Sequence, residues 1–286
     1  MTAYLALLGD LHGHYVLAAT LLKRWERETG KSIDAILQVG DMGIFPVPYT
    51  RIDEATKRFA EKDPDEISFQ QFYEGTGDAE LLFGGEQPLF DKNILFIGGN
   101  HEDFDFLAQH EGPGGICAVD AFGKFHYLKN GGETAIETKR NGPIVIAGLG
   151  GLEQSAGQRE PWHFSTVAYK KLMTKADVDI LLTHHPPLDG TTERGSPKVK
   201  ELIETVQPTY HFCGHYHDPG QQLSVQGKTQ SYLLNEVNFR NARTLNPGCV
   251  GILTWEHMLQ HSFAFLDEPW LQEYTRENYR AKLREL

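Results

Sequence analysis

The sequence has few cysteines, no long apolar run and no excess of positive charge. Its three cysteines, Cys117, Cys213 and Cys249, are odd in number and far apart, which argues against a disulfide framework and favours a reducing compartment. No apolar stretch approaches the roughly 20 residues that a membrane-spanning helix needs. The first strand-like run begins at Ala3, which leaves no room for a signal peptide. These features predict a cytoplasmic protein that does not enter the membrane.

Positive charge is also scarce, because 27 Lys and Arg stand against 39 Asp and Glu, for a formal net charge of −12. A diffuse acidic surface does not favour nonspecific nucleic-acid binding, which depends on clustered Lys and Arg. Internal repeats and low-complexity tracts are absent from the sequence. Since 286 residues suit one large core, we expect a single domain over residues 1–266 and a C-terminal helical tail over residues 267–286.

Apolar runs that end at glycine predict buried strands in the first hundred residues. These runs lie at 4–8, 33–39 and 93–97, and apolar residues at helical spacing predict a helix at 16–28. A long insert of mixed polar and aromatic residues follows the second run, at about 45–91, with a helix expected near 52–61. Four residues of the insert fit either a lid or a satellite core: Phe69, Phe72, Tyr73 and Glu74.

After residue 112 the pattern changes to short strands separated by Gly, Pro and Asn. Antiparallel strands are expected at 125–128, 134–138 and 144–149. Helices are expected at 166–174, after Ser165 as N-cap, and at 196–206, where Ser196 precedes a proline. Further strands are predicted at 178–183, 209–213, 223–225, 230–234, 244–246, 252–255 and 262–266.

Five short polar blocks follow these buried strands. They are Gly9-Asp10-Leu11-His12, Gly40-Asp41, Gly99-Asn100-His101-Glu102, His184-His185-Pro186 and Gly214-His215-Tyr216-His217. Each lies within a residue or two of the C-terminal end of a strand, where the loops of an open α/β sheet converge on a site. Any one block is common by chance, but five in this order are not. The blocks therefore predict one functional site.

The residue types in these blocks suit a pair of divalent cations. They supply two carboxylates, one amide oxygen and four imidazoles for metal, with one imidazole to spare. Such ligands without thiolate favour Mn²⁺, Fe²⁺ or Zn²⁺ and do not distinguish among them. A hydroxide that bridges two cations can attack phosphorus near neutral pH, and the cations offset the charge of the phosphate. The sequence therefore predicts a dinuclear phosphoesterase, whose local positive charge attracts a phosphate diester despite the acidic surface.

From Leu8 to about Asn246 these motifs resemble the calcineurin-like metallophosphoesterases. The resemblance implies a four-layer α/β/β/α sandwich of two mixed sheets, with the site at the strand ends. It implies that Asp41 bridges two metals, one held with Asp10, His12 and His217 and the other with Asn100, His184 and His215. His101 would lie near the phosphate without binding metal, as the acid that protonates the leaving oxygen.

The family pattern His-x-Pro favours His184 as the ligand and His185 as its neighbour. Histidines outside the motifs are expected to be surface or satisfied polar residues: His14, His110, His126, His163, His211, His257 and His261. Arg159 and Trp162 lie in a loop after a Gly-rich strand. An ordinary solvated loop is the commoner interpretation of these residues, and a contact with substrate is the alternative.

Within this superfamily, the blocks 9–13 and 99–102 resemble those of protein Ser/Thr phosphatases and dinucleoside tetraphosphatases. Those enzymes continue after the bridging Asp with a Val-Asp-Arg-Gly-like stretch, whereas Asp41 here leads into Met42-Gly43-Ile44. The resemblance to RNA lariat debranching enzymes is closer, through the long insert, the block 97–102 and the Gly-rich stretch 146–152. Some of those enzymes carry Cys where this chain has Asp10. The likeness implies a diesterase with a related insert.

Three functions follow from these comparisons of motifs. The first is a metal-dependent phosphodiesterase that acts on a nucleotide or nucleic-acid diester. The alternative enzyme is a phosphomonoesterase or a dinucleoside polyphosphate hydrolase, which the blocks 9–13 and 99–102 favour. The third is a non-catalytic binding scaffold on the same fold. Because all seven expected ligands and the acid are present, the motifs weigh against a scaffold.

Overall fold

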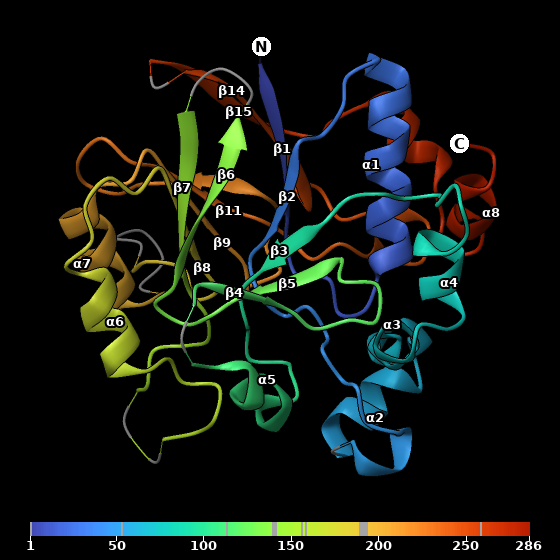
Figure 1. Ribbon diagram of the computed structural model, residues 1–286, viewed down its shortest axis with the longest axis horizontal. Coiled ribbons are helices and arrows are strands. Elements are labelled where there is room, and N and C mark those ends of the chain that lie inside the picture. The colour runs from blue at the N-terminus through green and yellow to red at the C-terminus, as the bar shows by residue number, and fades with distance from the viewer. Residues whose placement is uncertain are drawn as a thin grey trace.

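Two mixed β-sheets pack face to face, with helices on both outer faces (Figure 1). The computed structural model describes residues 2–52, 54–112, 114–138, 142–155, 157, 159–188, 194–257 and 259–286. The seven-stranded sheet has the order β15-β14-β1-β2-β3-β5-β4. Its strands are β1 (Ala3–Leu8), β2 (Ala35–Gln38), β3 (Ile94–Phe96), β4 (Ile116–Ala118), β5 (Phe125–Leu128), β14 (Val250–His257) and β15 (Gln260–Phe265).

The six-stranded sheet has the order β10-β11-β9-β8-β7-β6. Its strands are β6 (Glu133–Thr138), β7 (Gly142–Leu149), β8 (Ile180–Thr183), β9 (Tyr210–Cys213), β10 (Gln221–Leu223) and β11 (Gln230–Leu233). A small ribbon pairs β12 (Phe239–Arg240) with β13 (Thr244–Leu245). The predicted antiparallel pairing is only partly right, because β5 and β7 pair antiparallel with β4 and β6 but parallel with β3 and β8.

Successive side chains of a central strand point into two different cores. Because both faces of the strand are buried, its sequence is apolar throughout. In β1, Leu5 and Leu7 lie in the core between the sheets, while Ala6 and Leu8 lie in the core under the helices. In β8, Leu181 belongs to a third core, beneath the helices of the opposite face. Three stacked cores separate four layers. The structure therefore confirms the α/β/β/α sandwich.

The outer layers consist of short helices around the 15-residue helix α1. The α-helices are α1 (Tyr15–Thr29), α2 (Glu54–Ala60), α3 (Phe69–Glu74), α4 (Asp78–Phe83), α5 (Phe104–His110), α6 (Thr166–Leu172), α7 (Pro197–Val206) and α8 (Tyr279–Leu283), and the 3₁₀ helices are η1 (Tyr49–Arg51), η2 (Pro64–Ile67) and η3 (Pro269–Glu273). Ser165 and Ser196 cap α6 and α7 as predicted, since their side chains accept from the amides of Val167 and Val199. No helix in the described part of the chain is both long and apolar enough to cross a bilayer.

The insert packs on the main core. Phe69 and Phe72 of α3 are fully buried, and the ring of Phe72 lies 4.7 Å from that of Tyr15 and 5.0 Å from that of Phe125. These two residues therefore belong to the main core itself and form neither a lid nor a separate satellite core. Tyr73, in contrast, is 49% exposed.

The C-terminal segment contacts the insert through ion pairs and a hydrogen bond. Arg276 donates to Asp63 at 2.7 Å, and Arg280 donates to Asp65 at 2.5 Å. The hydroxyl of Tyr279 donates to the same Asp65 at 2.5 Å. These contacts join residues more than 200 positions apart in sequence, so η2 is held between α1 and the end of the chain.

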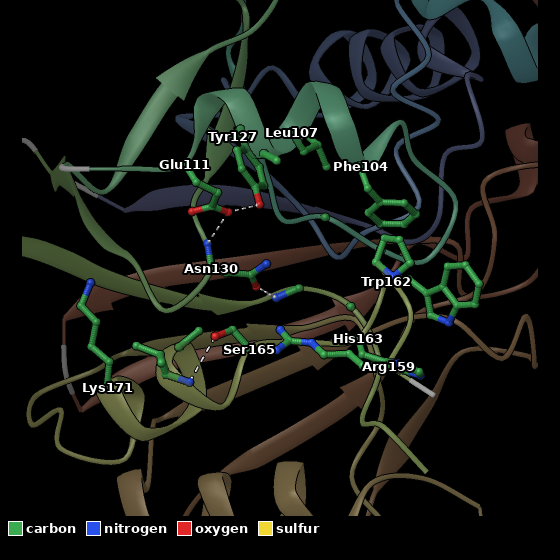
Figure 2. A pocket seen from close by; sticks show the side chains of 18 residues that line it. Phe104, Leu107, Glu111, Tyr127, Asn130, Arg159, Trp162, His163, Ser165 and Lys171 are labelled. Carbon is green, nitrogen blue, oxygen red and sulfur yellow. Dashed lines mark hydrogen bonds between the residues drawn. The ribbon is translucent and has the colours of Figure 1, made fainter. Parts of the chain in front are cut away.

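A pocket of about 530 Å³ opens between α5 and α6, beside the ends of β3 and β7 (Figure 2). Its floor is glycine backbone, from Gly98-Gly99 and Gly150-Gly151. It therefore adjoins the strand ends where the sequence places the polar blocks.

Candidate metal centre

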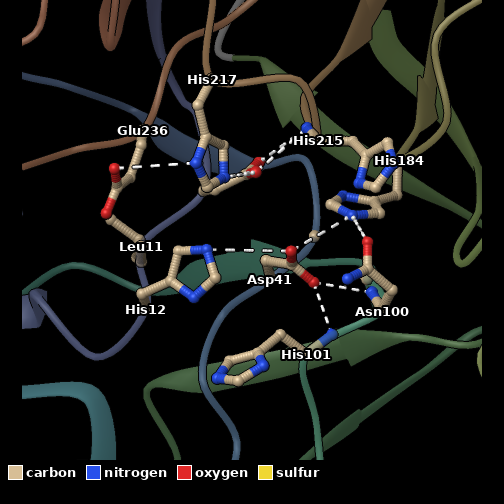
Figure 3. A network of polar contacts seen from close by, with 12 residues as sticks. Leu11, His12, Asp41, Asn100, His101, His184, His215, His217 and Glu236 are labelled. Carbon is tan, nitrogen blue, oxygen red and sulfur yellow. Dashed lines mark hydrogen bonds and ion pairs between the residues drawn. The ribbon is translucent and has the colours of Figure 1, made fainter. Parts of the chain in front are cut away.

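The carboxyl ends of strands from both sheets meet at one point, and all five polar blocks lie there (Figure 3). In the seven-stranded sheet, β1, β2 and β3 run parallel and end before Asp10, Asp41 and Asn100. In the six-stranded sheet, β8 and β9 run parallel and end before His184 and His215. The convergence of strand ends that the sequence predicts is therefore present, with each sheet contributing part of the site.

One cluster of potential ligand atoms comprises Asp10, His12, Asp41 and His217, whose donor atoms all lie within 4.8 Å of one another. His217 Nε2 is 3.0 Å from Asp10 Oδ2, and His12 Nε2 is 3.8 Å from Asp41 Oδ2. The amide of His215 also donates to Asp10 Oδ2, at 3.0 Å. These contacts hold the carboxylate of Asp10 against the turn that carries His215 and His217.

A second cluster comprises Asp41, His184 and His215, again within 4.8 Å. His184 Nε2 lies 3.4 Å from Asp41 Oδ2 and 2.9 Å from Asn100 Oδ1. The other ring nitrogen, Nδ1, lies 3.0 Å from the carbonyl oxygen of Val39, which can only accept. Nδ1 therefore carries the proton in the neutral ring, and the lone pair of Nε2 faces two oxygen atoms. A cation between these three atoms would relieve that repulsion.

The carboxylate of Asp41 belongs to both clusters. Its Oδ2 faces His12 and His184, while its Oδ1 accepts from the amides of Asn100 at 2.6 Å and His101 at 2.7 Å. Burial by itself would raise the pKa of Asp41, but His184 and the other imidazoles lower it, so the carboxylate stays charged. Asp41 in turn raises the pKa of buried His184 to about 9 against the effect of burial. The site thus favours positive charge beside Asp41.

The loops that carry these residues adopt unusual backbone conformations. Four residues have positive φ: His12 (42°), Asp41 (51°), His215 (77°) and His217 (51°). Such left-handed backbone is costly for residues other than glycine and concentrates at functional sites. Two glycines permit the close approach, since a Cβ on Gly99 would lie 2.0 Å from Asp41 Oδ1 and one on Gly214 would lie 2.1 Å from Asp10 Oδ1. The loops therefore accept backbone strain in order to bring these side chains together.

His101 lies at the edge of the site and belongs to neither of these two clusters, although His12, Glu66 and His101 form a third group of possible ligand atoms within 4.8 Å of one another. Its ring centroid is 5.1 Å from that of His12 and 5.1 Å from that of Phe45. Its Nε2 lies 2.5 Å from Glu66 Oε1. The ring therefore faces the insert.

Sequence reasoning missed Glu66, which enters the site from η2 in the insert. Its side chain is largely buried, and Oε1 lies 3.1 Å from His12 Nδ1. A carboxylate on Nδ1 holds the proton there and leaves Nε2 as the coordinating atom. His12 Nε2 is buried and, like His101 Nε2, has no hydrogen-bond partner among the described residues, so it is available to coordinate a cation. No spacing or strand end in the sequence marks Glu66.

Glu102 is a second residue to which the sequence assigned no role, although it completes the block that carries Asn100. Its carboxyl accepts from the amides of Met42 at 2.9 Å and Ile44 at 2.7 Å. It therefore ties the loop after β2 to the loop after β3. Burial and the charge of Asp41 raise the pKa of Glu102 to about 7.

His185 lies outside both clusters. Its Nδ1 accepts from the amide of Glu153 at 2.9 Å, and its Nε2 lies 3.4 Å from the Tyr216 hydroxyl. Burial, together with nearby His215, lowers its pKa to about 3, so the ring is neutral. His185 therefore supports the loop rather than the clusters.

The comparisons with known proteins agree with this geometry. Residues 4–219 match the family described as calcineurin-like phosphoesterase. The chain belongs to this family. It is therefore a phosphoesterase hydrolase of a family that depends on divalent metals.

Lariat debranching enzymes are among its curated relatives. The enzyme of Entamoeba histolytica is 26% identical over 274 residues, which cover 84% of this chain and 70% of that protein. The enzyme of Homo sapiens is 26% identical over 249 residues, which cover 74% of this chain and only 41% of that protein. The chain thus spans about two fifths of the human relative.

Among solved structures, the protein TT1561 of Thermus thermophilus has a TM-score of 0.50 at 14% identity, over 93% of this chain and 99% of that one. At this identity the likeness supports the fold alone.

Proposed function

We propose that this chain is a two-metal phosphodiesterase that acts on nucleotide or RNA diesters. The observation that carries the proposal is the position of Asp41, a buried carboxylate whose Oδ2 lies between imidazoles of two separate clusters. A shared carboxylate between two sets of donors is the arrangement that a pair of divalent cations requires.

The proposed ligands divide between two cations. One is held by Asp10, His12, Asp41 and His217, and the other by Asp41, Asn100, His184 and His215. Oxygen and nitrogen donors without thiolate fit Mn²⁺, Fe²⁺ or Zn²⁺. When bound, such a pair would lower the pKa of water at the site and offset the negative charge of the phosphate.

The protein's own residues provide orientation and proton transfer. Glu66 and the carbonyl of Val39 hold the outer nitrogens of His12 and His184, so that each ring turns Nε2 inward. His101, which has no place in either ligand set, holds a proton at Nε2 and donates it to the leaving oxygen. Acid assistance of this kind contributes roughly 10²–10⁴-fold to the rate.

A diester substrate is favoured over a monoester by the relatives, which are named as lariat debranching enzymes. The motif blocks 9–13 and 99–102 favour the alternative, a phosphomonoesterase or dinucleoside polyphosphate hydrolase. The ligand clusters serve either reaction, because they contact the phosphate and not its substituents.

Hydrolysis of bis-p-nitrophenyl phosphate, p-nitrophenyl phosphate and diadenosine tetraphosphate in Mn²⁺ separates these functions. We expect the highest kcat/KM with the diester. A strong preference for the monoester or the tetraphosphate would replace the diesterase proposal with the alternative. A protein that bound less than one equivalent of metal and hydrolysed none of the three would instead be a scaffold.

A further inference from the structure

The pocket between α5 and α6 is separated from the metal centre by one glycine. Gly99 lines this pocket, and its Cα is so close to Asp41 that a Cβ would lie 2.0 Å from Oδ1. The next residue, Asn100, belongs to the proposed ligand set. A substrate whose phosphate sits on the clusters therefore has this pocket, of about 530 Å³, directly beside it.

Two aromatic rings form one end of this pocket (Figure 2). Phe104 opens α5 and Trp162 lies in the loop before α6, and their ring centroids are 6.2 Å apart with an angle of 50° between the planes. Both side chains are partly exposed and line the pocket. Partly exposed aromatic faces beside a phosphate site offer a stacking surface for a nucleobase.

Cationic side chains line the same pocket. Arg159 lies close to the aromatic end, and Lys171 of α6 lies across the pocket (Figure 2). Neither is paired with a carboxylate in the described part of the chain. Glu111 is the acidic residue of the lining, and its Oε1 accepts from the Tyr127 hydroxyl at 2.8 Å. On a chain of net charge −12, this excess of cations is a local exception.

The adjoining pocket of about 770 Å³ has the opposite character. It shares Phe104 and Pro161 with the first pocket, but its lining contains no Lys or Arg among the described residues. Its charged residues are all acidic: Glu74, Glu102, Asp103 and Asp105. Of these two adjoining pockets, the acidic one would repel a polyanionic strand and the first would attract it.

We propose that the first pocket, which we name the Trp162 pocket, binds the nucleotide next to the scissile phosphate of a single-stranded oligonucleotide. Its base stacks on Trp162 and Phe104, while Arg159 and Lys171, on opposite sides of the pocket, each pair with a backbone phosphate of the strand. This inference rests on the proposed diesterase function and narrows its substrate class. It also assigns a contact with substrate to Arg159 and Trp162, whereas the sequence favoured an ordinary solvated loop for both residues.

The test compares an oligonucleotide with a diester that has no nucleotide to stack. Kinetics are measured on a short single-stranded RNA and on bis-p-nitrophenyl phosphate, and binding of the fluorescein-labelled RNA is measured by anisotropy in EDTA, where no cleavage occurs. The variants are Trp162→Ala and the double variant Arg159→Ala/Lys171→Ala. Matched controls are Lys170→Ala, the neighbouring exposed lysine of α6, and Tyr73→Ala, an exposed aromatic of the acidic pocket.

For Trp162→Ala we expect KM and Kd for the RNA to rise about tenfold, the loss typical of one base–aromatic stack. The kcat for bis-p-nitrophenyl phosphate should stay within about twofold of wild type, since any stacking of its nitrophenyl ring on Trp162 affects KM and not the chemical step. The double variant should also weaken RNA binding and flatten its salt dependence by roughly 1.4 in the slope of log K against log salt, for two phosphate contacts on a single strand. Both controls should behave as wild type.

Two results would overturn the inference. One is RNA binding by the pocket variants that equals that of the controls. The other is an equal loss on both substrates, which would show that the pocket residues support the site rather than bind a nucleotide. Failure of the diesterase proposal would look different, because wild type would then hydrolyse no diester while anisotropy still reported whether RNA binding depends on Trp162.

Discussion

Glu66 Oε1 lies 3.1 Å from His12 Nδ1 and 2.5 Å from His101 Nε2. One carboxylate of the insert therefore contacts both a proposed metal ligand and the proposed acid. The two imidazoles lower the pKa of Glu66 to about 2 although burial alone would raise it, so the carboxylate is charged at neutral pH. The insert in this way contributes a residue to the proposed reaction centre.

Removing Glu66 should weaken metal binding at the His12 side. In Glu66→Ala nothing else in the described residues holds the Nδ1 proton of His12, so its ring can rotate or change tautomer. Loss of such an outer partner typically costs 10–100-fold in metal affinity or activity, and we expect about tenfold in the Kd for Mn²⁺. Isothermal titration with Mn²⁺ and metal analysis after gel filtration measure the change.

Glu61→Gln, an exposed site of the same insert, is the control for Glu66→Ala and should bind metal as wild type. Glu66→Gln should be intermediate, because its amide oxygen can still accept from His12. Equal Mn²⁺ affinity in all four proteins would show that Glu66 does not position His12.

His101→Ala should slow hydrolysis without emptying the metal centre. The ring touches Glu66 and packs near Phe45 but lies outside both ligand sets. We expect kcat to fall about 10²–10⁴-fold for substrates with alkoxide leaving groups and much less for p-nitrophenolate, which leaves without a proton. Metal content, measured by mass spectrometry, should stay near that of wild type. A variant that lost one equivalent of metal would identify His101 as a ligand instead.

Asp41→Asn should reduce binding at both metal positions, because one carboxylate serves both. The Asn oxygen can still accept from the amides of Asn100 and His101, so the loop has a means to keep its shape. We expect metal content to fall from about two equivalents to less than one and the Mn²⁺-dependent rise in Tm to disappear. Asp267→Asn, at an exposed position, provides the control. Loss of only one equivalent would contradict the shared role of Asp41.

The stability of the protein should depend on pH through His211. Its Nε2 lies 2.9 Å from Thr183 Oγ1 and its Nδ1 2.8 Å from Ser231 Oγ, and burial lowers its pKa from 6.5 to about 3. Below pH 6.5 the imidazole of His211 takes up a proton in the unfolded chain but stays neutral in the folded chain. The free energy of unfolding therefore falls as the pH drops from 6.5 towards 3.

Substitution His211→Gln removes this proton linkage. Between about pH 7.5 and about pH 5, wild type should lose about 2 kcal/mol of stability relative to the variant, from the ordinary and the lowered pKa. Urea unfolding in EDTA at the two pH values measures the difference. A stability gap between the two proteins that does not change with pH would show that His211 is protonated in the fold.

The positions of Asp10, Asp41 and His184 were predictable because each follows a buried strand, and strand direction brings such positions together. Glu66 was not predictable, since nothing local places η2 beside His12. Its position depends on Phe69 and Phe72 packing under α1 and on ion pairs with the C-terminal segment. Strand pairing has the same limit. The short apolar runs predicted that β5 and β7 are strands, but they did not predict that β5 pairs parallel with β3 and β7 with β8.

Arg276 contacts Asp63, which precedes η2, and Arg280 contacts Asp65 within η2, the turn that carries Glu66. During translation, therefore, every proposed metal ligand has left the ribosome well before the arginines that secure this turn. A nascent chain would therefore pass through a stage in which all the proposed ligands have been made. At that stage Glu66, which contacts His101, is not yet held in place by these arginines. The contacts that hold this turn can therefore form only more than 200 residues after the first proposed ligand is made.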